Sequence, residues 1–377
     1  MNSAVPIHQS SNAESNFKLG GKHHSYLPAL DGLRAIAIAL VIIHHSAGGD
    51  FLAKGGFVGV DIFFVLSGFL ITSILIKEQN QNGRISLSLF YARRALRLFP
   101  ALFILFIAYV VYINLSGLSG EIKWLKYQAV LSALFYYNNW RMAFGGIDNL
   151  NQALIPTWSL SIEEQFYLVW PLALIGLLKL KSNKARISLI VAGIVIISLW
   201  QAIVWQDPAH AFRPFSGFDT RADGLLWGCL LGLYISQTGS QLFQLHRHAI
   251  TVLALYPVVF IAIVNFTAEW NAGYMYRGGF TLTCIASVFL LLEAYLKPAK
   301  LFSFALENKL SIFIGRISYG LYIYHLPIFI WIGTYKRHWI ISFALQIPLT
   351  LLVAILSYNL IEKPFLKLKK RYEPTTI

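Results

Sequence analysis

The chain has 377 residues, of which 56% are hydrophobic and only 13% are charged, and its mean hydropathy is +0.59. A soluble domain carries about 25% charged residues, so this composition excludes a soluble globular protein and predicts an all-α polytopic bundle of transmembrane helices. Basic cytoplasmic loops explain the net charge of +14 without a nucleic-acid partner.

Eleven apolar segments follow one another along the chain. The segment 124–137 covers only about 20 Å as a helix, less than a bilayer core of about 30 Å, and we expect it to be interfacial or re-entrant. The other ten are predicted to cross the membrane. They are 31–49, 57–76, 98–115, 157–178, 187–205, 222–236, 250–266, 278–296, 312–333 and 339–361.

The distribution of basic residues predicts the orientation. With ten spans and a cytoplasmic N-terminus, most of the 31 Lys and Arg residues lie in cytoplasmic loops. If 124–137 also crossed, the basic stretch KLKSNKAR (179–186) would lie outside and the asymmetry would weaken. We therefore expect both termini in the cytoplasm and no cleavable signal peptide. The expected divisions are a polar segment 1–25, a membrane domain 26–366 and a basic tail 367–377.

Arginines mark the cytoplasmic ends of two spans. Arg34 opens the first span, and the stretch FYARRALRLFP (90–100) leads into the third. Its residues Arg94 and Arg97 are three apart and share one helix face, and Arg93 and Arg97, four apart, share a neighbouring face. Arginine forks suit phosphate oxygens, so these residues are either a binding site for a phosphate-bearing ligand or simple topological anchors.

Acids and histidines lie deeper in the membrane. His45 is eleven residues beyond Arg34, about 16 Å along a helix, and His44 points about 100° away from it, so at most one of the two is expected to face a given site. A charge inside a span is costly and suggests function. Six such residues from five spans are expected either to line one cavity or to form buried structural pairs: His45, Asp61, Glu163, Arg221, Asp223 and His325.

This set of residues suits proton transfer. Histidine is the usual general base near neutral pH, and a phosphate-binding mouth favours group transfer from a phosphorylated cytoplasmic donor to a hydroxyl. The sequence has no P-loop, nucleophile elbow, HExxH or CxxC motif, and its two cysteines form no metal or disulfide motif. The alternative is a proton-coupled transporter that uses the same His and Glu residues as a relay, although such proteins usually contain paired half-repeats.

Seven motifs span nearly the whole chain. They are YLPALDGLRAIAIALVIIHH, GGFVGVDIFFVLSGFLITSIL, FYARRALRLFP, TWSLSIEEQFYLVWPL, RADGLLWG, GRISYGLYIYHLPI and SYNLIEKPF. In sequence and in order, these motifs resemble the acyltransferase-3 family of integral-membrane O-acyltransferases.

The resemblance implies a metal-free enzyme of the bacterial cytoplasmic membrane that moves an acyl group, commonly acetyl from acetyl-CoA, onto sugar hydroxyls. Known acceptors in the family include lipopolysaccharide O-antigen, exopolysaccharide, peptidoglycan and secreted antibiotics. Some relatives carry a fused extracytoplasmic SGNH-type domain after the last span. We expect none here, so the membrane domain completes the transfer or passes the acyl group to a separate periplasmic protein.

The resemblance also assigns roles to residues. It implies that His45 is the general base, aided by Glu163 and Arg34, and that Arg34, Arg93, Arg94 and Arg97 contact the phosphates of CoA. Further residues match family motif positions and are expected to contact the substrates: Asp61, Arg221, Asp223, Ser318, Tyr319 and His325.

Overall fold

The computed structural model describes residues 26–145, 152–239, 241–333, 338–369 and 372. Within these ranges every regular element is a helix, which confirms the predicted all-α class. The first half contains α1 (Pro28–His45), α2 (Gly49–Leu52), η1 (Gly56–Val58), α3 (Gly59–Asn82), α4 (Leu87–Leu115), α5 (Gly120–Leu134), α6 (Asn138–Gly145), η2 (Gln152–Leu154), α7 (Thr157–Lys179) and α8 (Asn183–Val204). The second half contains η3 (Pro208–His210), α9 (Phe212–Ser216), α10 (Phe218–Thr238), α11 (Gln241–Leu245), α12 (Arg247–Thr267), η4 (Met275–Gly279), α13 (Phe280–Tyr295), α14 (Lys300–Leu306), α15 (Lys309–Arg316), α16 (Ser318–Gly333), α17 (Trp339–Ser357), η5 (Tyr358–Glu362) and α18 (Lys363–Lys369).

Seven helical stretches in the described part of the chain are long and apolar enough to cross a membrane. A multi-pass membrane protein is therefore supported, but the predicted count of ten spans is not confirmed. The predicted spans 157–178 and 222–236 form α7 and α10, which carry several charged residues, and α16 has only 16 residues. The seven stretches are Pro28–His45, Gly56–Asn82, Leu87–Leu115, Asn183–Val204, Arg247–Thr267, Met275–Tyr295 and Trp339–Lys369.

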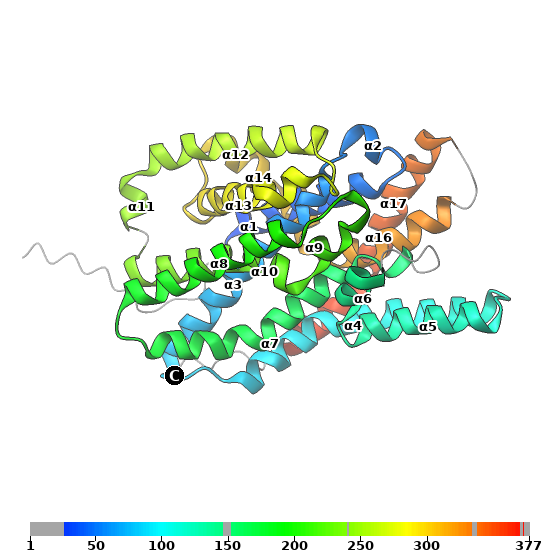
Figure 1. Ribbon diagram of the computed structural model, residues 1–377, viewed down its shortest axis with the longest axis horizontal. Helices are drawn as coiled ribbons and strands as arrows, with labels where there is room; N and C mark the ends of the chain where they lie inside the picture. The colour runs from blue at the N-terminus through cyan, green and yellow to red at the C-terminus, as the bar shows by residue number, and fades with distance from the viewer. Residues whose placement is uncertain (1–25, 146–151, 240, 334–337, 370–371, 373–377) are drawn as a thin grey trace, which may run out of the picture.

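The short segment predicted at 124–137 is the helix α5, which is not among these seven stretches. Its N-cap Ser119 accepts a hydrogen bond from the backbone N–H of Ile122, the usual way to satisfy a free N–H at a helix start. In Figure 1, α5 extends beyond the body of the bundle at the lower right. An interfacial or re-entrant placement of α5 stays a prediction.

The predicted span 312–333 is not one continuous helix. It is divided into α15 and α16 at Ile317, and Arg316 is the last residue of α15. The N-cap Asn308 fixes the start of α15 by accepting a hydrogen bond from the backbone N–H of Ser311. The break leaves α16 with 16 residues, fewer than the predicted span 312–333.

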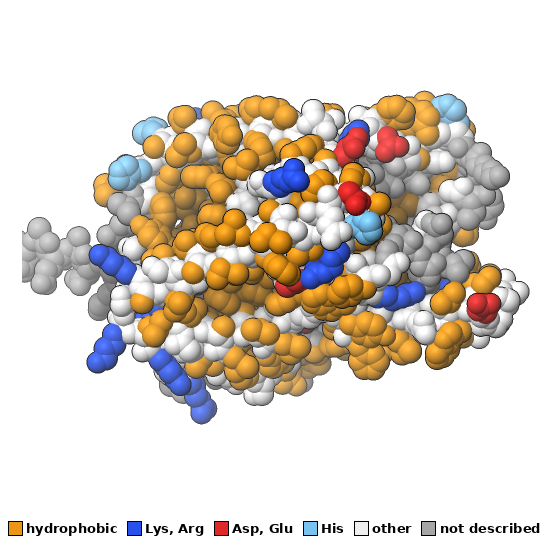
Figure 2. All heavy atoms as spheres, viewed as in Figure 1, with side chains coloured by type: hydrophobic (Ala, Val, Ile, Leu, Met, Phe, Trp, Pro, Cys, Tyr) orange, Lys and Arg blue, Asp and Glu red, His pale blue; other side chains and the backbone are white. Residues whose placement is uncertain are grey.

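The helices run roughly along the longest axis of the molecule, with α12 at the upper edge of the view and α7 and α4 at the lower edge (Figure 1). On the face shown in Figure 2, hydrophobic side chains cover most of the surface between the left and right ends of the molecule. Several Lys and Arg side chains gather at the left end, where α7 joins α8 in Figure 1. Lys179, Lys181 and Lys184 are exposed in that turn. The expectation of one basic membrane side stays a prediction.

Helices α3 and α10 pack closely at the centre of the bundle. Gly68 of α3 and Gly228 of α10 permit this approach, because a Cβ on either residue would collide with a backbone carbonyl oxygen of the other helix. Small residues at a membrane helix crossing commonly serve this purpose.

We predict that Gly228→Ala destabilises the protein by about 1–3 kcal/mol, because the added methyl group forces the two backbones apart. Thermal unfolding in detergent measures the effect. Gly176→Ala in α7 is the control, since nothing lies within 4 Å of the position that its added methyl group would occupy. Equal stability of both variants would contradict the close packing of α3 and α10.

Candidate active site

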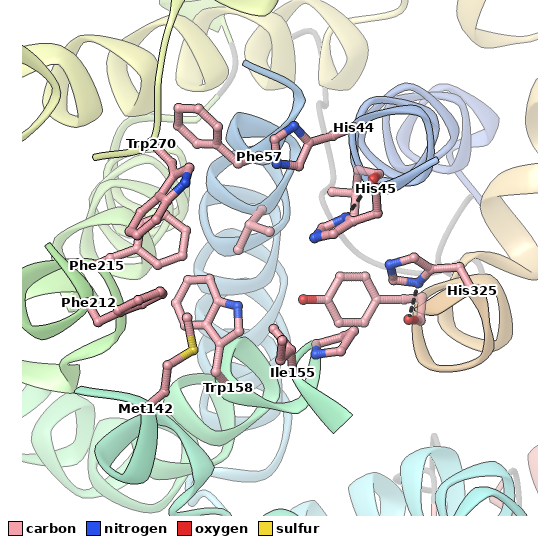
Figure 3. Close-up of a pocket in the computed structure, with 14 residues that line it drawn as sticks. His44, His45, Phe57, Met142, Ile155, Trp158, Phe212, Phe215, Trp270 and His325 are labelled. Atoms are coloured by element: carbon pink, nitrogen blue, oxygen red, sulfur yellow. Dashed lines mark hydrogen bonds between the residues drawn. The ribbon is translucent and has the colours of Figure 1, made fainter. Parts of the chain in front are cut away.

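A cavity of about 580 Å³, including its open mouth, lies between the ends of several helices. Helices α1, α7 and α16 supply one part of its wall, and η1, α9 and the segment after α12 supply much of the rest. In Figure 3 the histidines lie on one side and the large hydrophobic side chains on the other. The lining residues are Val41, His44, His45, Phe57, Val60, Met142, Ile155, Pro156, Trp158, Phe212, Phe215, Trp270, Tyr322 and His325.

His45 lies in the last turn of α1 and faces this cavity. Its Nδ1 donates a hydrogen bond of 2.9 Å to the backbone carbonyl oxygen of Val41, one helical turn earlier. A carbonyl can only accept, so Nδ1 carries the proton and Nε2 keeps a free lone pair. The imidazole is thus oriented by its own helix.

His325 of α16 lies beside His45 in the wall of the cavity, and the centroids of the two rings are 5.2 Å apart (Figure 3). Its Nδ1 donates to the carbonyl oxygen of Tyr322 at 2.6 Å. The side chain is completely buried, and its Nε2 has no hydrogen-bond partner among the described residues. The cavity therefore contains a second imidazole with a free lone pair.

His44 also lines the cavity, so the expectation that only one of the two adjacent histidines faces a given site is wrong. Its ring lies 4.9 Å from that of His45, edge to face, and its Nδ1 donates to the carbonyl oxygen of Ala53 at 3.0 Å. The end of α1 and the turn after it bring both rings to the cavity. Within the described chain, no group of three or more His, Cys, Asp or Glu side chains is arranged to bind a metal ion.

Aromatic side chains form the wall opposite the histidines (Figure 3). The rings of Trp158 and Phe215 lie 4.8 Å apart, and those of Phe212 and Trp270 lie 4.7 Å apart. The sequence did not reveal this wall. In a chain with 15% aromatic residues, no spacing pattern distinguishes four cavity-lining rings from rings that face lipid.

A second polar cluster lies between α4 and α7. The guanidinium of Arg94 lies 3.3 Å over the ring of Tyr167 and pairs with Glu164 at 3.4 Å. The hydroxyl of Tyr167 donates to Glu163 at 3.3 Å, so the predicted residues Arg94 and Glu163 share one network. Glu163 does not line the cavity.

Arg97 lies next to this network, within electrostatic range of Arg34, Arg94 and Glu163. Its side chain is exposed and makes no hydrogen bond or ion pair with the residues that the structure describes. Arg34 pairs with Asp31, three residues before it in α1, at 2.5 Å. The Arg97 guanidinium is therefore free to bind an anion.

Arg93 of α4 makes different contacts from Arg94. It forms a buried ion pair with Glu78 of α3 at 2.7 Å and donates to the backbone carbonyl oxygen of Tyr372 at 2.9 Å. This pairing fixes α4 against α3 and leaves little capacity for an external phosphate. Arg93 is consequently separated in role from Arg94 and Arg97.

Asp61, Arg221 and Asp223 do not line the cavity either. Arg221 pairs with Asp61 at 2.7 Å and lies 3.9 Å over the ring of Phe280, and both charged residues are at most 2% exposed. Asp223 accepts a hydrogen bond from Ser198 at 3.4 Å. The expectation that six membrane acids and bases share one cavity is therefore wrong for these three residues and for Glu163, and right for His45 and His325.

The two remaining predicted residues lie at the start of α16. Ser318 is buried, and the Tyr319 hydroxyl donates to the carbonyl oxygen of Leu98 at 2.8 Å, which ties α16 to α4. Neither residue lines the cavity. Glu362 of η5, which lies in the motif SYNLIEKPF but was not among the predicted site residues, is buried within electrostatic range of Arg97.

Comparisons with known proteins agree with these motifs. A protein-family model described as an acyltransferase domain matches residues 27–359. The peptidoglycan O-acetyltransferase OatA of Listeria monocytogenes is 34% identical over 356 residues, which cover 91% of this chain and 56% of that protein. YrhL of Bacillus subtilis, provisionally named a peptidoglycan O-acetyltransferase, is 32% identical over 360 residues, which cover 91% of this chain and 55% of that protein.

A Staphylococcus aureus protein (strain COL), provisionally named an O-acetyltransferase, is 33% identical over 356 residues, which cover 92% of this chain and 58% of that protein. The chain thus spans little more than half the length of these curated relatives. No solved structure matches it significantly. Because the family model covers most of the sequence, the chain belongs to the acyltransferase-3 family of membrane proteins that its motifs resemble.

Proposed function

We propose that this protein is a membrane O-acetyltransferase that moves acetyl from cytoplasmic acetyl-CoA to a hydroxyl of a cell-surface glycan. One observation carries the proposal. The Nε2 lone pair of His45 faces a cavity at one end of α1, while Arg34, near the start of the same helix, lies within electrostatic range of Arg97. A base and an anion-binding cluster are thereby separated by about 16 Å of helix.

The arginine cluster is the proposed donor site. The phosphates of acetyl-CoA bind Arg97 and Arg94, with Arg34 nearby, because guanidinium groups bind phosphate oxygens in a bidentate manner. Glu163 and Glu164 balance part of this positive charge and fix Arg94. The extended pantetheine arm then brings the thioester towards His45. Arg93 is left out of this site because Glu78 already occupies it.

His45 is the proposed general base. Its Nε2 removes the proton from the acceptor hydroxyl as the oxygen attacks the thioester carbonyl. The tetrahedral intermediate collapses, the carbon–sulfur bond breaks, and the imidazolium returns the proton to the departing CoA sulfur. The hydrogen bond from Nδ1 to Val41 holds the required tautomer throughout.

The acceptor enters from the side opposite the donor, through the mouth of the cavity. Two of the relatives are named for peptidoglycan, so we propose a cell-wall glycan as the acceptor and place both termini of the chain in the cytoplasm. The test supplies labelled acetyl-CoA to membranes that contain the protein and measures alkali-labile label on peptidoglycan. Label equal to that in membranes without the protein would refute the proposal, whereas substrate movement without an acetyl donor would identify a transporter.

We predict that Arg97→Gln raises the KM for acetyl-CoA about tenfold or more with a smaller effect on kcat, because a hydrogen bond to a charged group contributes about 1.5–3 kcal/mol. Steady-state kinetics with varied acetyl-CoA measures the change. Arg84→Gln, at an exposed arginine between α3 and α4, is the control. An unchanged KM would mean that Arg97 is only a topological anchor.

A further inference from the structure

Two of the three imidazoles that line the cavity, those of His45 and His325, face each other and offer hydrogen-bond acceptors and no donors. In both His45 and His325 the Nδ1 proton is committed to a carbonyl of the same helix. Both Nε2 atoms therefore carry lone pairs, and that of His325 is buried without a partner in the described chain. A buried acceptor of this kind is complementary to an O–H or N–H group on a ligand.

The aromatic wall restricts the shape of that ligand. Trp270 is half-buried and packs against Phe212, and Trp158 packs against Phe215. Figure 3 shows these rings across the cavity from His45 and His325. The apolar face of a sugar ring can lie on such a surface while its hydroxyl groups point to the opposite wall, in the way that apolar pockets with a few polar groups orient their ligands.

We propose that this cavity is the acceptor subsite and that it selects a sugar ring with two hydrogen-bond donors. The reacting hydroxyl donates to Nε2 of His45, and a second O–H or N–H of the same ring donates to Nε2 of His325. His325 thus determines which hydroxyl reacts, because the second contact fixes the rotation of the ring over the aromatic wall. The inference rests on the proposed function and adds the recognition of the acceptor.

The structure provides matched variants of His325. In His325→Asn the side-chain amide N–H takes the place of Nδ1–H and can still donate to Tyr322, while Nε2 is removed. In His325→Gln the amide oxygen reaches the Nε2 position and restores an acceptor. The first variant therefore deletes the proposed contact alone, and the second replaces it.

The experiment uses the full chain in lipid nanodiscs with labelled acetyl-CoA. The acceptors are the methyl glycoside of N-acetylglucosamine and analogues that each lack one hydroxyl or the acetamido group. For the wild type, the analogue that lacks the O–H or N–H group donating to His325 should have a kcat/KM about tenfold or more below that of the parent compound. With His325→Asn, kcat/KM for the parent compound should fall by a similar factor. The analogue without that donor should then have the same kcat/KM as the parent compound. His325→Gln should recover part of the discrimination.

Three results would count against the inference. If His325→Asn keeps the wild-type discrimination among the analogues, the contact does not exist, although acetyl transfer itself still supports the proposed function. If the wild type transfers acetyl to none of the sugars and to no peptidoglycan, the proposed function fails as well. If His325→Asn does not fold, Trp270→Ala provides the test. This variant should raise the KM for the sugar and leave the KM for acetyl-CoA unchanged. An unchanged sugar KM would exclude the aromatic wall as the binding surface.

Discussion

Replacing His45 with asparagine is expected to lower kcat for acetyl transfer by about 10²–10⁴-fold, the usual contribution of a general base. The asparagine amide can keep the hydrogen bond to Val41 that His45 Nδ1 makes in the last turn of α1. The variant removes only the lone pair that faces the cavity, so the loss should appear in kcat at unchanged KM for acetyl-CoA. Initial rates with labelled acetyl-CoA measure it.

A histidine outside the cavity provides the control for this variant. His210 lies in an exposed turn and pairs with Asp207 at 2.9 Å, so His210→Asn should transfer acetyl at the wild-type rate. Gel filtration and thermal unfolding confirm that both variants are folded. If folded His45→Asn kept more than about half of the wild-type rate, His45 could not be the base, and His325 would become the candidate.

The largest expected effect on stability comes from Arg221. Removing one partner of a buried ion pair costs about 3–5 kcal/mol, because it leaves an uncompensated charge. Arg221→Met leaves the carboxylate of Asp61 without its charged partner between α3 and α10. We expect strongly reduced expression and a lower unfolding temperature. The double variant Asp61→Asn/Arg221→Met should recover part of the loss, because the buried charge is then absent.

The pair of Arg213 and Asp219, which join at 2.6 Å, provides a matched control. It is more exposed than the pair of Asp61 and Arg221, so Arg213→Met should cost about 1 kcal/mol or less. An Arg221→Met protein that is as stable as the wild type but inactive would contradict a structural role. It would restore the expectation from the sequence that Arg221 binds substrate.

Most helices could be predicted from the sequence because apolar residues dominate them. The exceptions have physical causes. Helices α7 and α10 carry Glu163, Glu164, Arg221 and Asp223, which lowers their hydropathy, although Arg221 and Asp223 are buried in the protein and the two glutamates are partly buried. The break at Ile317 depends on the packing of α15 against α1, where Gly315 meets the backbone of Asp31. Hydropathy carries no information on either point.

The polar residues of the site were predicted by type and depth, but their partners were not. Spacing within α4 makes Arg97 a neighbour of both Arg93 and Arg94, and it cannot reveal that Glu78 of α3 pairs with Arg93. Asp61 and Arg221 are 160 residues apart in sequence, and only the fold brings them together. The sequence therefore indicates a functional membrane centre, while the division into a histidine cavity, an arginine cluster and a structural ion pair requires three-dimensional contacts.

The central claim is that donor and acceptor reach His45 from opposite sides of the membrane. Proteoliposomes with the protein in one orientation test it most directly, with labelled acetyl-CoA on the side of the α7–α8 turn and the glycan acceptor on the other side. The account predicts labelled acetyl ester on the glycan across the sealed bilayer, and none with His45→Asn. Transfer that occurs only when donor and acceptor share one compartment would contradict it.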